Sequence, residues 1–295
     1  MMKKALVIGG SGFMGSHLAD ELTERGFEVT VYDHEKSPWL NPKQKFIQGD
    51  ILNQEQLNTA LSGMDVVYHY AGVADIGEAA KTPKNALNVN IMGTTCVLEA
   101  CVKNQVKRIM FASTVYVYSD QGSFYRVSKQ ATESIIEAYQ EKFGIDYTIL
   151  RYGSLYGERS QAWNGLKKYI TQALQDGRID YRGTGKERRE YIHVTDAARL
   201  SVDALDHKYL NKSLTLTGNE VFESLQLMRL IEEIVGKKID IQLKELPEKN
   251  DHYEMTPYRY SAKPGIKVVL NEFVDLGQGI LRLVEEVARE VGKHK

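Results

Sequence analysis

The chain has 295 residues, of which 42% are hydrophobic and 26% charged, and its formal net charge is −1. This length is enough to bury a full hydrophobic core and fits one large domain or one domain with a smaller cap. The balanced charge excludes a disordered acidic chain and argues against a nucleic-acid-binding protein, which needs a basic face.

The cysteines and the apolar runs indicate the cellular compartment of the protein. Cys96 and Cys101 are the only cysteines, and two thiols cannot build a disulfide framework, so a reducing cytoplasm is expected. No apolar run reaches the roughly 18 residues that a membrane span needs. The first apolar run, residues 5–8, ends at a pair of glycines; it is too short for a signal peptide and predicts a strand. We therefore expect a cytoplasmic protein whose partners include neither a membrane nor a nucleic acid.

The first half of the chain alternates short apolar runs with amphipathic stretches of helix length. The predicted strands are residues 5–8, 28–32, 45–47, 65–69, 108–112 and 147–150. The predicted helices between them are residues 14–24, 55–61, 85–103 and 128–142. Unbroken apolar runs are typical of strands that are covered on both faces. The alternation therefore predicts an α/β fold with a doubly wound parallel sheet.

The regularity is weaker after residue 151. Helix-like stretches remain at residues 166–175, 195–205, 225–235 and 278–291. We predict a first domain of residues 1–151 and a smaller C-terminal α/β cap of residues 152–295. Residues 190–215 are expected to return from the cap to the first domain and pack on its sheet.

A glycine-rich turn follows the first predicted strand directly. Gly9, Gly12 and Gly15 stand three residues apart and lead into the first helix. Such a turn lets the backbone approach a pyrophosphate, and the N–H groups and dipole of the helix then hold the anion. The position after a strand favours a dinucleotide site, as in Rossmann domains; the alternative is a structural turn without a ligand.

Asp33 closes the second predicted strand, eighteen residues after Gly15. A carboxylate there can accept hydrogen bonds from the adenosine ribose and repels a 2′-phosphate. The next residues, His34 and Glu35, offer no arginine to such a phosphate. The first domain is therefore predicted to bind NAD rather than NADP, unless Asp33 is simply a solvated strand end.

Tyr125 and Lys129 stand four residues apart at the start of a predicted helix and so share one face. A phenol with a pKa near 10 is a poor base at neutral pH. An ammonium group one turn away favours the phenolate and lowers that pKa. This pair by itself most often marks a solvated helix face, so it needs support from the rest of the chain.

Five further segments, together with the glycine turn and this pair, resemble the extended short-chain dehydrogenase/reductases, the nucleotide-sugar epimerase and dehydratase family. The matching segments are residues 69–78, 88–95, 112–118, 150–157 and 189–196. They occur in the order and spacing of the family over nearly the whole chain. The resemblance implies a Rossmann fold, NAD as cofactor, a nucleotide-diphosphate sugar as substrate, and a homodimer formed through the helices near residues 90–103 and 128–142.

The resemblance also implies roles for single residues. Tyr125 would be the general base, Lys129 would hold the nicotinamide ribose, and Thr114 would hydrogen-bond the reacting oxygen. Asn90 would lie behind the cofactor. The implied cofactor-binding residues are Gly9, Gly12, Phe13, Met14, Asp33, His34, Asp50, Ile51, Tyr70, Ala71, Gly72, Ala74, Asn90, Ala112, Ser113, Tyr125, Lys129 and Tyr152.

The substrate side of the family pattern is matched less closely. Arg189 would bind the diphosphate, where its planar fork of donors suits phosphate oxygens. Arg182 stands where the family often has an aromatic residue that stacks on the base, so UDP, GDP and dTDP all remain open. Arg259 is a candidate second phosphate ligand or a solvated surface residue. The implied substrate-binding residues are Thr114, Ser154, Leu166, Arg182, Arg189 and Arg259.

Departures from the family pattern narrow the reaction. Val115 and Tyr116 stand where related dehydratases have an acid pair and related decarboxylases a glutamate. Cys96 and Cys101 fit buried, inert thiols better than a Cys/His pair for proton transfer. We therefore expect a nucleotide-sugar 4-epimerase that works through a 4-keto intermediate. The alternatives are a 4-dehydrogenase or 4-ketoreductase, including one for a GDP-sugar, and a non-catalytic NAD-sensing protein.

Two remaining patterns predict no chemistry of their own. The seven histidines show no metal-ligand spacing, so no metal site is expected. Residues 187–190 form a mixed-charge run, which predicts a solvated turn. Only the family position of Arg189 suggests a function within that run.

Overall fold

The computed structural model describes residues 3–219, 221–244 and 255–257. By its internal contacts the chain divides into a compact unit, Met1–Ser261, and a second unit, Ala262–Lys295, which lies outside the described residues. The predicted helix at residues 278–291 and the candidate ligand Arg259 also lie outside the described residues.

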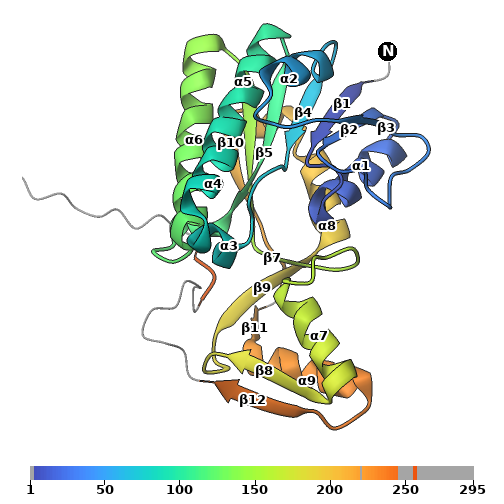
Figure 1. Ribbon diagram of the computed structural model, residues 1–295, viewed down its shortest axis with the longest axis vertical. Coiled ribbons are helices and arrows are strands. Elements are labelled where there is room, and N and C mark those ends of the chain that lie inside the picture. The colour runs from blue at the N-terminus through green and yellow to red at the C-terminus, as the bar shows by residue number, and fades with distance from the viewer. Residues whose placement is uncertain (1–2, 220, 245–254, 258–295) are drawn as a thin grey trace, which may run out of the picture. The chain divides into compact units, whose positions relative to one another are not determined.

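A seven-stranded parallel sheet dominates the described unit (Figure 1). The strand order is β10-β6-β5-β4-β1-β2-β3. The strands are β1 (Lys4–Ile8), β2 (Glu28–Asp33), β3 (Lys45–Gln48), β4 (Val66–His69), β5 (Arg108–Thr114), β6 (Asp146–Tyr152) and β10 (Lys212–Leu216). The six predicted strands are all present, which confirms the α/β fold. The sequence does not predict β10, because this edge strand alternates polar and apolar residues instead of carrying an apolar run.

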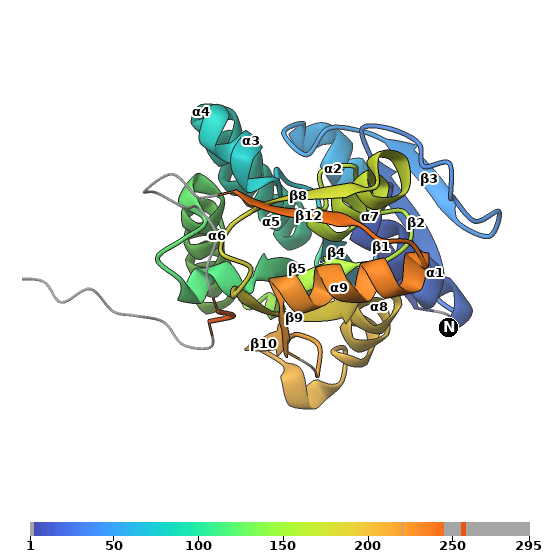
Figure 2. The ribbon, with the colours of Figure 1, turned by 90° about the horizontal axis from the view of Figure 1, so that it is seen from below.

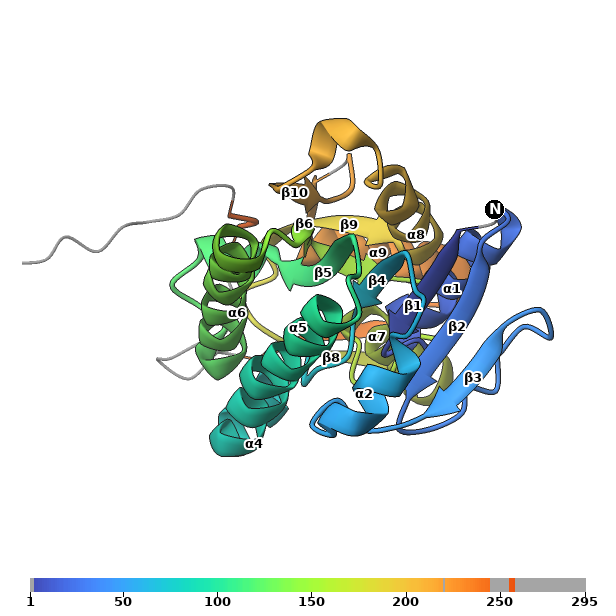
Figure 3. The same cartoon turned by 90° about the horizontal axis from the view of Figure 1, so that it is seen from above.

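Helices cover both faces of this sheet (Figure 3). They are α1 (Phe13–Glu24) and α8 (Val194–Asp203) on one face, and α2 (Gln54–Ala60), α5 (Gly93–Lys103) and α6 (Ser123–Phe143) on the other. Alternate residues of a strand point to opposite faces, so β1 sends Ala5 and Val7 into one core and Leu6 and Ile8 into the other. Both sets are fully buried, which explains the unbroken apolar runs. None of the described helices is long and apolar enough to cross a membrane.

The predicted helix at residues 85–103 is interrupted. The structure resolves it into α4 (Pro83–Leu87), a single π-helical turn (Asn88–Met92) and α5; a further short helix, α3 (Ile76–Lys81), precedes it. Hydrophobic periodicity does not reveal such a turn, because it changes the backbone hydrogen bonding over only a few residues. Single π turns within helices are frequent at functional sites, and this one carries Asn90.

Smaller sheets and two helices follow the sixth strand, below the large sheet in Figure 1 and facing the viewer in Figure 2. A three-stranded sheet has the order β11-β9-β7, and β12 pairs with β8. The elements are β7 (Ser154–Tyr156), α7 (Gly165–Asp176), β8 (Arg178–Arg182), β9 (Arg188–His193), β11 (Val221–Glu223), α9 (Ser224–Val235) and β12 (Asp240–Lys244). Ile179 and Tyr181 of β8 share a core with α7 and α9. Residues 194–216 return to the large sheet as α8 and β10, whereas the division into two domains at residue 151 stays a prediction.

The core of the large sheet should be sensitive to truncation. Ile109 in β5 is fully buried, so we expect Ile109→Ala to lower the free energy of unfolding by about 2–5 kcal/mol. Ile234 in α9 is 75% exposed, so Ile234→Ala should change it by less than about 0.5 kcal/mol. Urea unfolding followed by circular dichroism measures both values. Equal losses from the two variants would contradict the placement of β5 at the centre of the core.

Candidate active site

A cavity of about 1230 Å³ lies at the carboxyl ends of β1, β2, β4, β5 and β6 and extends to the residues of β7, β8 and β9. Parallel α/β sheets bind their ligands at this edge. The predicted site residues that line the cavity are Gly9, Gly12, Phe13, Met14, Asp33, His34, Asp50, Ile51, Tyr70, Ala71, Gly72, Ala74, Ala112, Ser113, Thr114, Tyr125, Lys129, Tyr152, Ser154, Leu166, Arg182 and Arg189. Cofactor-side and substrate-side candidates therefore share one cavity. Asn90 does not line it, and Arg259 lies outside the described residues.

The three glycines of the turn differ in how much room the structure leaves for a side chain. Gly9 has a φ of +82°, and a Cβ on it would lie 2.4 Å from the backbone nitrogen of Ala71. A Cβ on Gly15 would lie 2.1 Å from the carbonyl oxygen of Gly9. A Cβ on Gly12 would meet only that same oxygen, at 3.4 Å. The fold thus requires Gly9 and Gly15, whereas Gly12 keeps backbone open toward the cavity.

The N-terminus of α1 begins at this turn. Gly12 is its N-cap residue, and no side chain caps the helix or places an acid in its first turn. The first N–H groups of a helix have no partner within the helix, and together with the helix dipole they attract an anion. The turn therefore fits the pyrophosphate of a dinucleotide.

Asp33 ends β2 beside the turn and is 8% exposed. Its Oδ2 accepts a hydrogen bond from the backbone N–H of Ser11 at 2.9 Å, and its Oδ1 lies 2.9 Å from Nδ1 of His34. These contacts hold the carboxylate at the wall of the cavity. A carboxylate fixed there fits the hydroxyls of an adenosine ribose and disfavours an added phosphate.

Lys129 is buried one turn after Tyr125 in α6. Its Nζ donates a 2.8 Å hydrogen bond to the carbonyl of Ala112, and lies 4.6 Å from the centroid of the Phe111 ring and 6.0 Å from that of Tyr125. Burial lowers the pKa of Lys129 to about 8, although the carboxylate of Glu133 acts in the opposite direction. An ammonium group at this distance electrostatically favours a phenolate at Tyr125.

Thr114 lies at the end of β5, and a 3₁₀ turn (Val115–Tyr118) follows it. Its Oγ1 accepts a 3.2 Å hydrogen bond from the backbone N–H of Tyr116. A hydroxyl carries one proton and two lone pairs, so this contact leaves the proton of Thr114 for an acceptor in the cavity. The ring of Tyr116 packs edge-on against Tyr125, with the centroids 6.3 Å apart.

Asn90 connects the π turn to the start of α6. Its Oδ1 accepts from the N–H of Val73 at 2.8 Å, and its Nδ2 donates to the carbonyl of Val73 at 3.1 Å and to Oγ of Ser128 at 2.9 Å. Ser128 in turn donates to the carbonyl of Tyr125 at 2.8 Å. Asn90 therefore positions the cavity loop and the Tyr125 turn from behind.

Three predicted cofactor residues use their hydroxyls away from a ligand. The Tyr70 and Tyr152 hydroxyls lie 2.5 Å apart, and that of Tyr152 also lies 2.5 Å from Oγ of Ser201. Burial raises the pKa of Tyr70 to about 12, so this phenol stays neutral. Ser113 donates its hydroxyl hydrogen to Glu133 at 2.5 Å. The two tyrosines therefore offer ring surface, and Ser113 offers backbone.

The sequence predicts a solvated turn at residues 187–190. This prediction is wrong for the two glutamates, because Glu187 and Glu190 are both buried. Glu187 accepts hydrogen bonds from the N–H of Thr184 at 2.7 Å, the N–H of Gly185 at 2.9 Å and the Tyr181 hydroxyl at 2.8 Å. Burial alone would raise the pKa of Glu187, but these hydrogen bonds outweigh it and lower the pKa. The carboxylate folds inward because it closes the tight turn that follows Arg182.

The cap side of the cavity includes residues that the motifs do not indicate. Besides Arg182 and Arg189, the cavity is lined by Gln161, Trp163, Asn164, Lys168 and Tyr169. The buried Oε1 of Gln161 has no hydrogen-bond partner within the described part of the chain. These residues are close in the sequence, in the loop after β7 and the first turns of α7, but they match none of the motifs.

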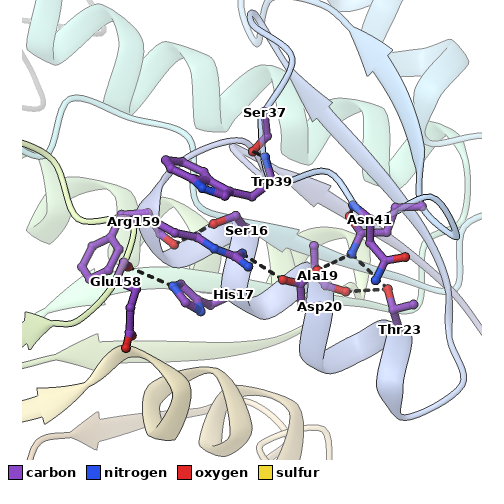
Figure 4. Close-up of polar contacts among 12 residues, drawn as sticks. Ser16, His17, Ala19, Asp20, Thr23, Ser37, Trp39, Asn41, Glu158 and Arg159 are labelled. Carbon is purple, nitrogen blue, oxygen red and sulfur yellow. Dashed lines mark hydrogen bonds and ion pairs between the residues drawn. The ribbon is translucent and has the colours of Figure 1, made fainter.

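That loop is attached to α1 by side chains that are far apart in the sequence (Figure 4). Nε2 of His17 lies 3.0 Å from the carbonyl oxygen of Glu158, and Arg159 forms a 2.8 Å ion pair with Asp20. The guanidinium of Arg159 also lies 5.7 Å from the ring centroid of Trp39. The contacts hold the loop after β7 against the helix that begins at the glycine turn. No cluster of three or more metal-ligating side chains occurs among the described residues.

The glycine turn can be tested by comparing two alanine variants. Gly12→Ala should change the unfolding free energy by less than about 1 kcal/mol, because its backbone is regular and its Cβ has room. It should weaken NAD binding at least tenfold, because the added methyl group faces the pyrophosphate site. Gly15→Ala should instead destabilise the fold, since its Cβ collides with Gly9. Thermal melts and NAD titration calorimetry separate the effects; unchanged NAD affinity in Gly12→Ala would contradict the assignment.

Comparison with known proteins gives the family. Residues 5–214 match the NAD dependent epimerase/dehydratase family. The chain is 30% identical to the UDP-N-acetyl-α-D-glucosaminuronate decarboxylase of Bacillus cytotoxicus, over 77% of this chain and 78% of that protein. Its fold is similar to the UDP-glucose 4-epimerase of Thermotoga maritima, with a TM-score of 0.80, 27% identity, and coverage of 88% of this chain and 90% of that one.

A second similar structure contains both kinds of ligand. The UDP-glucuronic acid 4-epimerase of Bacillus cereus, in complex with UDP-glucuronic acid and NAD, has a TM-score of 0.78 and is 28% identical, covering 88% of this chain and 90% of that one. The glycine turn, the open N-terminus of α1 and Asp33 fit this cofactor. The chain therefore belongs to the NAD-dependent epimerase/dehydratase family of extended short-chain dehydrogenase/reductases, and it is an enzyme that uses NAD.

Proposed function

We propose that the protein is a nucleotide-sugar 4-epimerase that works through a 4-keto intermediate. One observation carries the proposal: Tyr125, Lys129 and Thr114 line the same cavity as the glycine turn and Arg189. A base, a hydrogen-bond donor, a dinucleotide site and a candidate phosphate ligand thus share one cavity. The 4-epimerases among the similar structures support the same reaction.

Each residue of this constellation has a step to perform. Bound NAD supplies the acceptor, and later the donor, of the hydride. Tyr125, as phenolate, removes the proton of the sugar hydroxyl, and the Lys129 ammonium stabilises the phenolate. Thr114 donates its free proton as a hydrogen bond to the reacting oxygen, where negative charge develops. After the 4-keto sugar has presented its other face, Tyr125 returns the proton to the C4 oxygen, and the hydride returns from the cofactor to that face of C4, which gives the C4 epimer.

The substrate is proposed to be a UDP-sugar. Arg189 would bind the diphosphate, and its guanidinium fork suits phosphate oxygens. The three similar proteins named above act on or bind UDP-sugars. Ser154, Leu166 and Arg182 would contact the sugar and the base. The homodimer likewise stays a prediction.

The chain lacks the acidic residues after Thr114 that related dehydratases and decarboxylases have. Val115 is fully buried and apolar, and Tyr116 carries no carboxylate, so the residues after Thr114 offer no acid pair for water loss. Cys96 and Cys101 do not take the place of this acid pair, because burial raises the pKa of both thiols and keeps them neutral. These features favour simple oxidation and reduction at one carbon.

Replacing the proposed base gives the first test. Tyr125→Phe should lower kcat by about 10²–10⁴-fold, because general acid–base catalysis contributes that much, and should leave NAD binding intact. Tyr139→Phe is the matched control: this tyrosine lies in the same helix, and its hydroxyl donates to Glu99. Undiminished turnover in Tyr125→Phe would refute the mechanism.

The net reaction is tested with the purified protein and no added cofactor. UDP-glucose, UDP-glucuronic acid, UDP-N-acetylglucosamine, GDP-mannose and dTDP-glucose are incubated separately and followed by proton NMR, with absorbance at 340 nm recorded in parallel. We expect C4 epimers without accumulation of NADH. Stoichiometric NADH with a 4-keto sugar would indicate a 4-dehydrogenase instead. The absence of both products across UDP-, GDP- and dTDP-sugars would contradict an enzyme for these substrates and favour an NAD-sensing protein.

A further inference from the structure

Glu133 is a buried carboxylate behind the cavity wall, one helical turn after Lys129. It is 7% exposed, and both of its oxygens are used. Oε1 accepts from the Ser113 hydroxyl at 2.5 Å and from Nε of Arg151 at 3.0 Å, and Oε2 accepts from Nη2 of Arg151 at 2.6 Å. The family motifs do not indicate it, although its position four residues after Lys129 places it on the same helix face.

Stability alone does not explain a buried ion pair such as Glu133 and Arg151. Removing two charges from water is expensive, and a buried ion pair is often no more stabilising than apolar residues of similar size. Arg151 forms a two-pronged contact with Glu133, and its third nitrogen donates to the Tyr118 hydroxyl at 2.6 Å. The pair connects α6, β5 and β6 at the carboxyl edge of the sheet, next to the residues that we propose to be catalytic.

Lys129 lies one turn before Glu133 on the same face of α6. Tyr125 and Glu133 lie near it on α6, the neutral carbonyl of Ala112 on β5 accepts from it, and His69 faces it from β4. Burial, reinforced by Lys129, lowers the pKa of His69 to about 3, so that imidazole is uncharged. Glu133 is the anion that favours the charged form of Lys129, and Arg151 offsets part of its charge.

We propose that Glu133 is a positioning residue: its carboxylate keeps Lys129 in the ammonium form and holds Ser113, the neighbour of Thr114, while Arg151 sets how much negative charge Lys129 experiences. This proposal rests on the function proposed above, because Lys129 has to be cationic only if Tyr125 acts as the base. Ser113 connects the two roles, since it lies between Ala112, which accepts from Lys129, and Thr114.

Substitution of Glu133 and substitution of Arg151 should shift the pKa of Lys129 in opposite directions. Glu133→Gln removes the negative charge, so Lys129 should lose its proton at lower pH. Arg151→Met removes the offsetting positive charge, so Lys129 should keep its proton to higher pH. A merely structural role would loosen the site in both variants and move Lys129 in the same direction.

The measurement is a pH titration of lysine side chains by NMR, with ¹³C at Cε, on the protein with its bound NAD. The Lys129 signal is assigned by its loss in Lys129→Met. We expect its midpoint to move down by about half a pH unit or more in Glu133→Gln, and up in Arg151→Met. Glu137→Gln is the matched control, because Glu137 lies one turn further along α6 and is exposed; it should leave the midpoint unchanged.

Turnover provides a second readout. The high-pH limb of the kcat profile should move in the same direction as the Lys129 midpoint in each variant. An unchanged midpoint in Glu133→Gln, or shifts of equal sign in the two variants, would overturn the proposal. If the midpoints move as expected but no nucleotide sugar is converted by the wild-type protein, the proposed function fails while the charge relation between Glu133 and Lys129 stands.

Discussion

Two layers of helices cover the parallel sheet, and this constraint decides where chemistry can occur in the protein. Strands that are buried on both faces carry mainly apolar side chains along their length. The polar groups of the cavity therefore lie at the carboxyl edge, where β1, β2, β4 and β5 end. The glycine turn, Asp33 and Thr114 each occupy the last residues of a strand or the turn directly after it, so parallel packing brings them to one cavity.

Close backbone contact keeps this edge in shape. Gly9 lies against the backbone of Ala71, and Gly15 lies beneath the carbonyl of Gly9, so the turn after β1 is fixed by both the neighbouring loop and its own helix. Asn90, in the π turn, connects that loop to Ser128 and through it to the Tyr125 turn. The loop beside the glycine turn and the Tyr125 turn are thus connected by a short chain of hydrogen bonds.

Charge is balanced within the site at short range. Burial disfavours the Lys129 ammonium, the Glu133 carboxylate favours it, and Arg151 moderates that carboxylate. The net charge of −1 for the whole chain gives no hint of this arrangement. The cap has its own example in Glu187, whose carboxylate is buried because it accepts the N–H groups of a tight turn.

The sequence by itself determined the features that depend on neighbours in the chain. Apolar runs gave six strands of the sheet, and local spacing located the glycine turn, Asp33, and the Tyr125 and Lys129 pair, all of which line the cavity. Only the tertiary structure decided the pairing of Glu133 with Arg151 and the attachment of Arg159 to Asp20. These partners come from different elements and meet because the sheet and helices pack, so no local pattern records them. The tertiary structure also decided the burial of Glu187 and the π turn at Asn90. In both places, hydrogen bonding in the folded chain overrides what the charge pattern and the periodicity predict.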